Sequence, residues 1–528
     1  MERTTIFLAL AIVTMILLIV VPINSYACSF EEKFEWVKQT FEENDAGVPH
    51  ILERRGQAAY EAHNRMILER IRSAESMNEF LQISWDWLRF FRSGHHQIML
   101  NPNLITADLE QNEEEAEEST VSQPIHYSWN GDIDQFIEYV DTLDDKTSYE
   151  GIWDIGGAYA IGIIREGDSY IGFIIESAYE EWLPNMIKLR IDTDGDDVVS
   201  TFYVRDFSPE VSETPTMIGN NLMRMGNNRD VKRIKPMFPD SPYIVNYLRF
   251  ITSIEPFFEK INEYTLYFRL PIFSDCTDYL EEIIKENIAL ITSTENLIID
   301  LRNNPGGGAA TPLLEYLFTN PIVSPTEFDF YATQSNIQQV YDLSQGINLI
   351  WDSIEEEFRD DMMKFSAILY ELIKDKVGEF VELSVDTTVV NAWLRNGREL
   401  ISYDKIYQYP KNVGIIANRG TGSAAEHYII SAKQSNKVKV FGEPTFGAVD
   451  TGFITVGGFL ESPCGEIWLR YSNARFANLP GLIFDDIGIQ PDFFIDNTVP
   501  DYRWVEHVTE IMNGWLTGTE TRRRRGRR

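Results

Sequence analysis

The sequence predicts an α/β protein in which helices cover both faces of a largely parallel sheet. Apolar residues make up 44% and aromatic residues 12% of the 528 positions, enough for a large core. From about residue 278 onward, short and continuously apolar strands alternate with helical stretches, which is typical of buried parallel strands. The chain before that point has a different pattern, so we expect further folding units there.

The first unit is predicted to be helical and to span residues 28–100. Apolar residues recur there at helical spacing, with a break at 45–49 (DAGVP). An acidic linker is predicted over 101–124, because its charges repel one another and it has no apolar face. A strand-rich insert is predicted over 125–270, where short β-branched runs end at Gly or Asp.

The α/β core is predicted over residues 271–500, followed over 501–528 by a C-terminal helix and a basic tail. Each core element is recognised by its apolar period and by the residues that end it. The expected helices span 278–290, 311–319, 354–376 and 423–435, and the expected strands span 297–301, 413–417 and 438–441.

The charge balance restricts the partners of the protein. It has 46 Lys and Arg against 82 Asp and Glu, a net charge of −36. Binding to phosphate backbones needs clustered basic residues, so a nucleic-acid partner is not expected. No cofactor and no metal are expected. The run 192–197 (DTDGDD) has the alternating Asp residues of a calcium loop, but its twelfth position is Tyr203, so we predict a turn between strands.

The N-terminus predicts export. Residues 6–23 are almost entirely apolar, and small residues follow at Ser25 and Ala27, so 1–27 is predicted to be a signal peptide, with an uncleaved membrane anchor as the alternative. The expected location is therefore extracytoplasmic, either secreted or periplasmic. The chain has three cysteines, at 28, 276 and 464, which allow at most one disulfide. For Cys276 and Cys464 the favoured interpretation is a small buried apolar side chain.

The first candidate site is a glycine-rich turn at 296–308 (NLIIDLRNNPGGG), where a buried strand leads into the next helix. Glycines accept positive φ and lack a Cβ, so their N–H groups can converge on an anion. The turn matches neither G-x-G-x-x-G nor the Walker pattern, which argues against a nucleotide phosphate. Oxyanion binding and an ordinary tight turn both remain open.

The second candidate is Ser423 in the segment 413–426 (VGIIANRGTGSAAE). A serine at the start of a helix, after a buried strand and a glycine-rich turn, is exposed near the positive end of the helix dipole, which suits a nucleophile. The same residues also spell a capping box, in which Ser423 and Glu426 satisfy backbone N–H groups. Both interpretations remain open.

A serine nucleophile needs a base, and the chain has seven histidines. His95 and His96 follow a glycine at the end of the third N-terminal helix. If the chain is extended there, their side chains point to opposite faces and only one can serve. His427 lies four residues after Ser423 on the predicted helix, where a packing role is expected.

Four motifs together resemble the tail-specific, C-terminal processing serine peptidase family, which includes the tricorn core and the retinoid-binding protein of the retina. The motifs are the two turns above, 440–447 (VFGEPTFG) and 485–492 (DDIGIQPD), and the similarity extends over about 245–500. The resemblance implies a ClpP/crotonase-like α/β core. It also implies Ser423 as nucleophile, with an oxyanion hole formed by Ala424 and by Gly306 or Gly307.

One residue departs from that pattern. The tail-specific branch uses a Lys base where this chain has Ala448, so a Ser-Lys dyad is missing. The tricorn-like branch takes its base from a His after the N-terminal helices and an acidic residue near the last motif. That similarity implies His95 as the base and Asp485 as the residue that orients it, with Asp486 as the alternative. No PDZ pattern occurs in 125–270, and the strand-rich insert is expected to guide substrate instead.

The expected function is therefore that of a serine endopeptidase acting on peptide or protein substrates. The alternative is an inactive protein on the same scaffold that binds a peptide or an apolar ligand. A third hypothesis is an acyl-CoA enzyme of the crotonase type, which also builds oxyanion holes from backbone N–H groups. The predicted export and the Gly-Thr-Gly-Ser turn argue against it.

Overall fold

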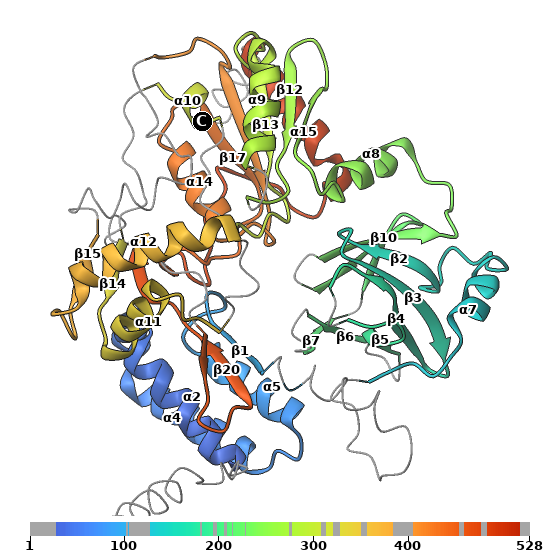
Figure 1. Cartoon of the computed structure of the whole chain (residues 1–528). Helices are drawn as coiled ribbons and strands as arrows, with labels where there is room; N and C mark the ends of the chain where they lie inside the picture. Colours follow the sequence, from blue (N-terminus) through green and yellow to red (C-terminus); the bar gives the residue numbers. More distant parts are fainter. Residues whose placement is uncertain are drawn as a thin grey trace, which may run out of the picture.

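The computed structural model describes residues 28–101, 104, 127–179, 182–193, 198–204, 209–213, 215–226, 229–273, 277–307, 313–319, 328–349, 356–383, 405–453, 459–476 and 483–517. The predicted leader, the acidic run of the linker, Cys276 and the basic tail lie outside these residues. Figure 1 shows an α/β core, a helical unit at the N-terminus and a separate strand-rich unit beside the core.

A six-stranded sheet forms the centre of the core, in the order β11-β12-β13-β16-β17-β22. Neighbouring strands from β12 to β22 are parallel, and β11 is antiparallel to β12. The bounds are β11 Phe257–Lys260, β12 Thr265–Arg269, β13 Asn296–Asp300, β16 Asn412–Ala417, β17 Val438–Gly442 and β22 Phe493–Phe494. The prediction of a largely parallel sheet is confirmed.

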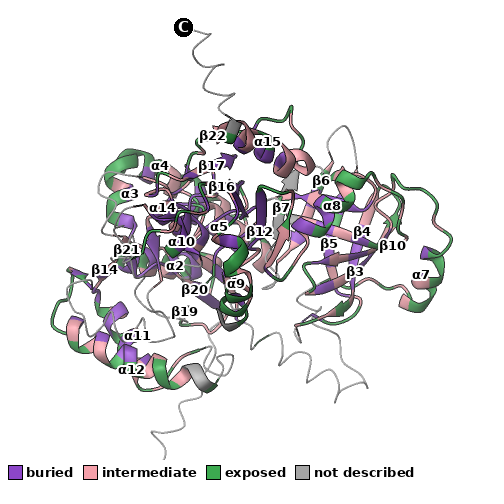
Figure 2. Cartoon of the chain, turned by 90° about the horizontal axis from the view of Figure 1, so that it is seen from above, coloured by how far each residue is buried: buried purple, intermediate pink, exposed green. Residues whose placement is uncertain are grey.

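Helices pack on both faces because successive strand residues point to opposite sides. In β13, Leu297 and Ile299 face the apolar cluster under α9, α10 and α14, whereas Ile298 faces the cluster under α8 and α15. These helices are α8 Pro242–Ile251, α9 Thr277–Ile291, α10 Leu314–Leu317, α14 Ala424–Ala432 and α15 Trp504–Thr517, the last preceded by the 3₁₀ turn η3 Asp501–Arg503. Figure 2 shows the buried residues concentrated on the core strands.

The strand-rich insert is a nine-stranded antiparallel sheet, in the order β7-β6-β5-β4-β3-β2-β10-β9-β8, with an apolar core of its own. The insert ends before residue 257, earlier than the predicted 270, because β11 and β12 belong to the core sheet. Its elements are α7 Ile133–Val140, β2 Gly151–Ile155, β3 Tyr159–Glu166, β4 Ser169–Ser177, β5 Ile187–Asp192, β6 Val199–Tyr203, β7 Pro209–Glu213, β8 Thr216–Ile218, β9 Leu222–Met225 and β10 Arg229–Lys235. Asp192 pairs with Val199, so the acidic run at 192–197 joins two strands, as predicted; its residues 194–197 are outside the described part.

The N-terminal unit contains α2 Phe30–Asn44, α3 Val48–Arg55, α4 Gln57–Arg72 and α5 Met77–Leu88, which share one apolar core. The predicted break at 45–49 separates α2 from α3. After α5, β1 Gln97–Leu100 pairs with β20 Ile467–Arg470, and β19 Phe459–Glu461 pairs with the other edge of β20. This small sheet joins the N-terminal helices to the last third of the chain.

A four-stranded sheet, in the order β15-β14-β21-β18, completes the fold together with two helices. These elements are β14 Phe328–Tyr331, α11 Gln334–Ser344, α12 Glu356–Ile373, β15 Phe380–Glu382, β18 Thr451–Gly452 and β21 Ala474–Phe476. The predicted helices at 278–290, 354–376 and 423–435 are observed as α9, α12 and α14. The described part of 311–319 contains the short α10.

A disulfide joins Cys28, just before α2, to Cys464 in the turn between β19 and β20. The expectation that Cys464 is a buried apolar side chain is therefore wrong, because spacing along the chain does not reveal a partner 436 positions away. Within the described ranges, no helix has the length and apolarity needed to cross a membrane. Those ranges also contain no group of side chains that could hold a metal ion.

Candidate active site

Ser423 lies on a tight turn between β16 and α14, at the carboxyl end of the parallel strands. Its backbone has φ +51° and ψ −119°, a region that side-chain-bearing residues rarely adopt. The buried Thr421 holds the turn, because its hydroxyl donates to the carbonyl oxygen of Leu301 at 2.8 Å. The end of β13 thus fixes the serine turn that follows β16.

His95 faces this serine. Its Nε2 lies 2.9 Å from Ser423 Oγ, and its Nδ1 lies against the carbonyl oxygen of Thr451. A carbonyl oxygen can only accept, so Nδ1 carries the proton and Nε2 is left as an acceptor for the serine hydroxyl. Burial, reinforced by the nearby Arg92 cation, lowers the pKa of His95 to about 4, so the ring is neutral at pH 7.

The loop that carries His95 is held from behind by Arg92. The guanidinium donates from Nε to Gly94 O at 2.9 Å and from Nη2 to His95 O at 3.1 Å. It also pairs with both carboxylate oxygens of Asp45, and both side chains are almost completely buried. His95 itself has φ +58°. Our sequence reasoning missed Arg92 and Asp45, because no local pattern marks an ion pair between the ends of two helices.

The two other histidines considered as bases have packing roles. His96 is buried, its Nε2 bonds to Arg92 O at 2.7 Å, and its ring packs on Trp85. Only His95 of the pair reaches Ser423. The chain is not extended at this point, because His95 has φ +58°, so the assumed alternation of an extended chain is not the reason. The ring of His427 packs on Phe476 with centroids 3.9 Å apart, which agrees with the packing role predicted for it.

Glu426 is buried and joins the serine turn to the loop at 445–448. Its Oε2 accepts from Ser423 N at 3.0 Å and Ala448 N at 2.8 Å. Its Oε1 accepts from Gly447 N at 2.9 Å and from the Thr445 hydroxyl. The Glu426 contact that a capping box requires is therefore present, while the serine hydroxyl also lies beside His95. The capping and nucleophile interpretations of this segment are compatible.

Ala448 occupies the place of the missing Lys base. It is buried, and its Cβ lies 3.0 Å from the position that a Cβ on Gly94 would take. The loop that delivers His95 therefore packs directly on residue 448. A long cationic side chain at 448 would collide with that loop.

The glycine-rich loop lies against the serine turn. A Cβ on Gly306 would lie 2.7 Å from Ala424 N and 2.8 Å from Ser423 Cβ, and both Gly306 and Gly307 have positive φ. The Gly306 N–H donates to Asn304 Oδ1 at 2.9 Å, so it is already engaged, contrary to its predicted role as a donor. The N–H groups of Gly307 and Ala424 have no hydrogen-bond partner among the described residues.

Asp485 does not contact the His95 ring, unlike the expected orienting residue. Its Oδ1 accepts from the backbone N–H groups of Val449 and Asp450, at 2.8 and 2.9 Å. Those bonds hold the loop that leads to Thr451, whose carbonyl takes the orienting position instead. Burial, together with the neighbouring Asp450 carboxylate, raises the pKa of Asp485 well above its ordinary value.

Asp486, the predicted alternative to Asp485, holds the His95 loop at a different point. Its Oδ1 accepts from Ser93 N at 2.8 Å, and its Oδ2 pairs with Arg55 at 3.1 Å. Neither acidic residue reaches the imidazole. Motif position alone could not distinguish a carboxylate that binds backbone N–H groups from one that binds a ring.

The strand-rich insert contacts the glycine-rich loop. Asn303, which has φ +57°, donates from Nδ2 to Asp230 Oδ2 on β10 at 2.9 Å, and Asp230 pairs with Arg224 of β9. Asn303 also accepts from Asn418 Nδ2 at 2.8 Å. The insert, the glycine-rich loop and the serine turn are therefore joined by one chain of polar contacts.

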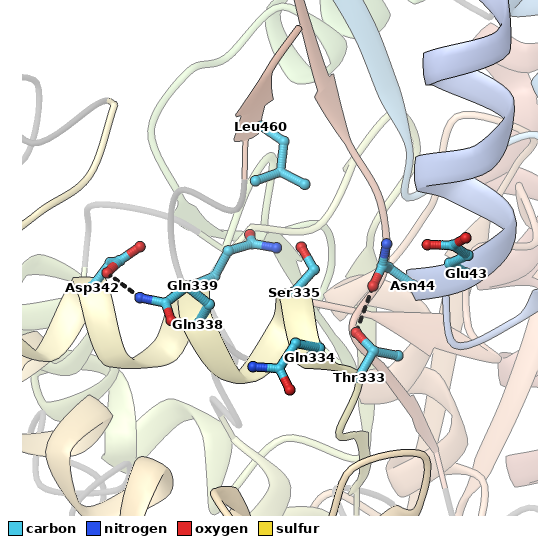
Figure 3. Close-up of a pocket in the computed structure, with 9 residues that line it drawn as sticks. All are labelled: Glu43, Asn44, Thr333, Gln334, Ser335, Gln338, Gln339, Asp342 and Leu460. Carbon is cyan, nitrogen blue, oxygen red and sulfur yellow. Dashed lines mark hydrogen bonds between the residues drawn. The ribbon is translucent and has the colours of Figure 1, made fainter. Parts of the chain in front are cut away.

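A separate hollow of about 480 Å³ lies between the end of α2 and α11 (Figure 3). It is lined mainly by polar side chains, and the Thr333 hydroxyl donates to Asn44 Oδ1 at 2.6 Å within it. None of the predicted site residues lines this hollow. It is distinct from the site around Ser423.

The α/β core and a serine hydroxyl set against a neutral imidazole define the class of serine hydrolases. A model of peptidase family S41 matches residues 264–495. The α/β core over these residues is therefore similar to peptidase family S41, a family of serine peptidases.

Known proteins resemble this chain at low sequence identity. A protein of Chlamydia trachomatis serovar D is 24% identical over 262 residues, a match that spans 45% of this chain and 42% of that relative. Mature CPAF complexed with lactacystin has a TM-score of 0.44 and 11% identity, covering 92% of this chain and 97% of the other. The photosystem II D1 C-terminal processing protease has a TM-score of 0.34 and 12% identity, with coverages of 90% and 94%.

Proposed function

We propose that this protein is a serine endopeptidase with Ser423 as nucleophile and His95 as general base. The observation that carries the proposal is the 2.9 Å separation between Ser423 Oγ and an imidazole nitrogen left unprotonated by its tautomer. His95 Nε2 takes the hydroxyl proton while Oγ attacks the peptide carbonyl carbon. The imidazolium then gives that proton to the leaving amine, and water releases the acyl group by the reverse sequence.

The oxyanion of this reaction would be held by the N–H groups of Ala424 and Gly307. Neither N–H group has a hydrogen-bond partner within the described part of the chain. Ala424 follows Ser423 in the sequence, and Gly307 follows Gly306, which lies against the serine turn. A donor of this kind typically contributes about 2.7 to 4 kcal/mol to the transition state. Gly306 supports the hole through its missing Cβ rather than through its N–H.

The proposed location is extracytoplasmic, with the leader over 1–27 as a signal peptide or an anchor. The disulfide between Cys28 and Cys464 supports this, because structural disulfides persist in oxidising compartments and are rare in reducing ones. The proposed partners are peptide or protein substrates, and the membrane only through an uncleaved leader.

The test is covalent labelling by a fluorophosphonate probe combined with cleavage of quenched peptides. We expect wild-type protein to be labelled and active, Ser423→Ala to lose both, and His95→Gln to lose about 10² to 10⁴ in rate. The control is Ser344→Ala, because Ser344 is at the exposed end of α11. Labelling that persists in Ser423→Ala would reject the nucleophile. Peptide binding without labelling or cleavage by wild-type protein would favour an inactive binding protein.

A further inference from the structure

Strand β20 presents its side chains to two different environments. Ile467 and Leu469 belong to the apolar core of the N-terminal helices. Trp468 and Arg470 alternate with them and point to the other side of the small sheet. Two residues after Arg470, the Ser472 hydroxyl donates to the carbonyl oxygen of His95 at 3.0 Å. The face that carries Arg470 therefore continues toward the proposed base.

The guanidinium of Arg470 has no anionic partner among the described residues. It is half-buried and stacks on the Phe453 ring, with Cζ 3.7 Å from the ring centroid. Its Nε is buried and donates to no acceptor there, and the same is true of Trp468 Nε1 on the same face. Burial lowers the pKa of Arg470 to about 10, and no neighbouring carboxylate opposes that shift.

Such an arrangement is costly for a folded protein. A buried donor left unsatisfied destabilises the folded state, and a charged donor does so more strongly. Stacking on an aromatic ring offsets part of that cost but satisfies no N–H group. By contrast, Arg92 lies in the same region and has both carboxylate oxygens of Asp45. In a chain of net charge −36, an arginine near the site that has no anionic partner within the described ranges is therefore informative.

Arg470 is close to the proposed chemistry. The Phe453 ring that it covers also packs on the His95 ring, with centroids 5.5 Å apart. The two contacts limit the separation of Arg470 Cζ from the His95 ring centre to about 9 Å, or at most three residues of extended peptide. That separation is within the span of a peptide whose cleaved bond lies at Ser423.

We propose that Arg470 is a specificity-determining residue that binds a carboxylate of the peptide substrate within three residues of the cleaved bond. This inference rests on the proposed peptidase function. The planar fork of an arginine matches the two oxygens of a carboxylate. The Arg470 side chain is only half-buried, so part of its guanidinium remains exposed, although Nε is buried. The carboxylate is either an acidic side chain or the free C-terminus of the substrate, which present the same chemistry.

The first experiment compares matched quenched peptides with the wild-type protein. One series replaces Asn by Asp at each of the three positions on either side of the cleaved bond. A second series carries a free C-terminal carboxylate or its amide, one to three residues after that bond. We expect kcat/KM to be about 10- to 100-fold higher for the preferred carboxylate peptide than for its neutral match. The series that shows the difference identifies the source of the carboxylate.

The second experiment assigns the effect to Arg470. We expect Arg470→Gln to cleave the carboxylate peptide and its neutral match with equal kcat/KM. Arg470→Lys keeps the positive charge but lacks the planar fork of the guanidinium. Its preference for the carboxylate peptide should lie between those of the wild-type and Arg470→Gln proteins. The control is Arg249→Gln, because Arg249 also stacks on a phenylalanine ring, at 4.7 Å, but is paired with Glu259 on the opposite face of the core.

Two outcomes overturn the proposal: equal cleavage of both members of every pair by wild-type protein, or a preference that survives in Arg470→Gln. If wild-type protein cleaves no peptide, the proposed function fails separately. In that case, fluorescence anisotropy of the same peptides with Ser423→Ala protein still tests Arg470. Equal affinity for the carboxylate peptide and its neutral match would then reject the inference.

Discussion

The Arg92 guanidinium donates a hydrogen bond to the backbone carbonyl of His95, at 3.1 Å. The same group pairs with Asp45 at the end of α2, so the imidazole is positioned through its own main chain by an ion pair buried between two helices. The His95 backbone has positive φ, which a residue with a side chain keeps only where surrounding contacts enforce it. Arg92 and Asp45 are therefore positioning residues for the proposed base.

Arg92→Lys is expected to lower kcat by about 10² to 10⁴ with a much smaller change in KM, because the base loses its orientation while the peptide site remains. A lysine can neither form the fork with Asp45 nor reach both backbone carbonyls. Kinetics and thermal unfolding should be measured together, since disrupting a buried pair costs several kcal/mol. The control is Arg70→Lys, which alters the partly exposed Arg70–Asp86 pair. A folded Arg92→Lys protein with normal kcat would contradict the positioning role.

Gly306→Ala is expected to lower kcat/KM by about 10² or more and to slow fluorophosphonate labelling. The new Cβ would lie 2.7 Å from Ala424 N, at the proposed oxyanion hole. Gly378→Ala is the matched control, because Gly378 also has positive φ but a Cβ there meets nothing within 4 Å. Equal activity of the two variants would show that the glycine-rich loop is not part of the hole.

In the pH profile of kcat/KM, the loss of activity in acid is expected to have its midpoint near pH 4, well below the ordinary histidine pKa of about 6.5. Burial disfavours the imidazolium, and the Arg92 and Arg470 cations add to that effect. Removing a cation raises the pKa, so Arg470→Gln should move the midpoint to higher pH. A midpoint that stays near pH 6.5 in wild-type protein would contradict a buried neutral His95.

The same shift predicts a loss of stability in acid. The folded state holds the His95 ring neutral while the unfolded chain binds a proton below about pH 6.5, so its contribution to the free energy of unfolding declines from there toward pH 4. Asp485 acts in the opposite direction, because its raised pKa favours the folded state at low pH. Comparing denaturation of wild-type and His95→Gln proteins between pH 4 and 7 isolates the histidine contribution.

Cys464→Ser is expected to destabilise the protein by about 2–4 kcal/mol, measured by chemical denaturation. The bridge ties the start of α2 to the turn of the sheet that packs on the N-terminal helices. Cys276→Ser is the matched control, because it leaves the Cys28–Cys464 bridge intact. Equal stability of the two variants under oxidising conditions would show that the bridge contributes nothing.

Local sequence patterns predicted the elements of the core well. The buried strand β13 and the turn from β16 into α14 depend on apolar runs, glycines and caps within about a dozen residues. The local sequence was therefore sufficient to predict both elements. The roles of side chains that contact distant segments could not be predicted from the local sequence. Asp485 was expected at the imidazole but binds two backbone N–H groups, and the Gly306 N–H is taken by Asn304.

The sequence by itself determined the order of helices and strands, the exposed turn at Ser423 and the presence of two histidines after α5. Only the tertiary structure decided which histidine meets that serine, which atom orients it and where the cysteines pair. Secondary structure follows from interactions between near neighbours, whereas His95 and Ser423 are separated by 328 positions and meet through contacts between distant segments, such as the pairing of β1 with β20. That Arg470 has no anionic partner among the described residues could likewise be recognised only from the folded positions of the carboxylates in that part of the chain.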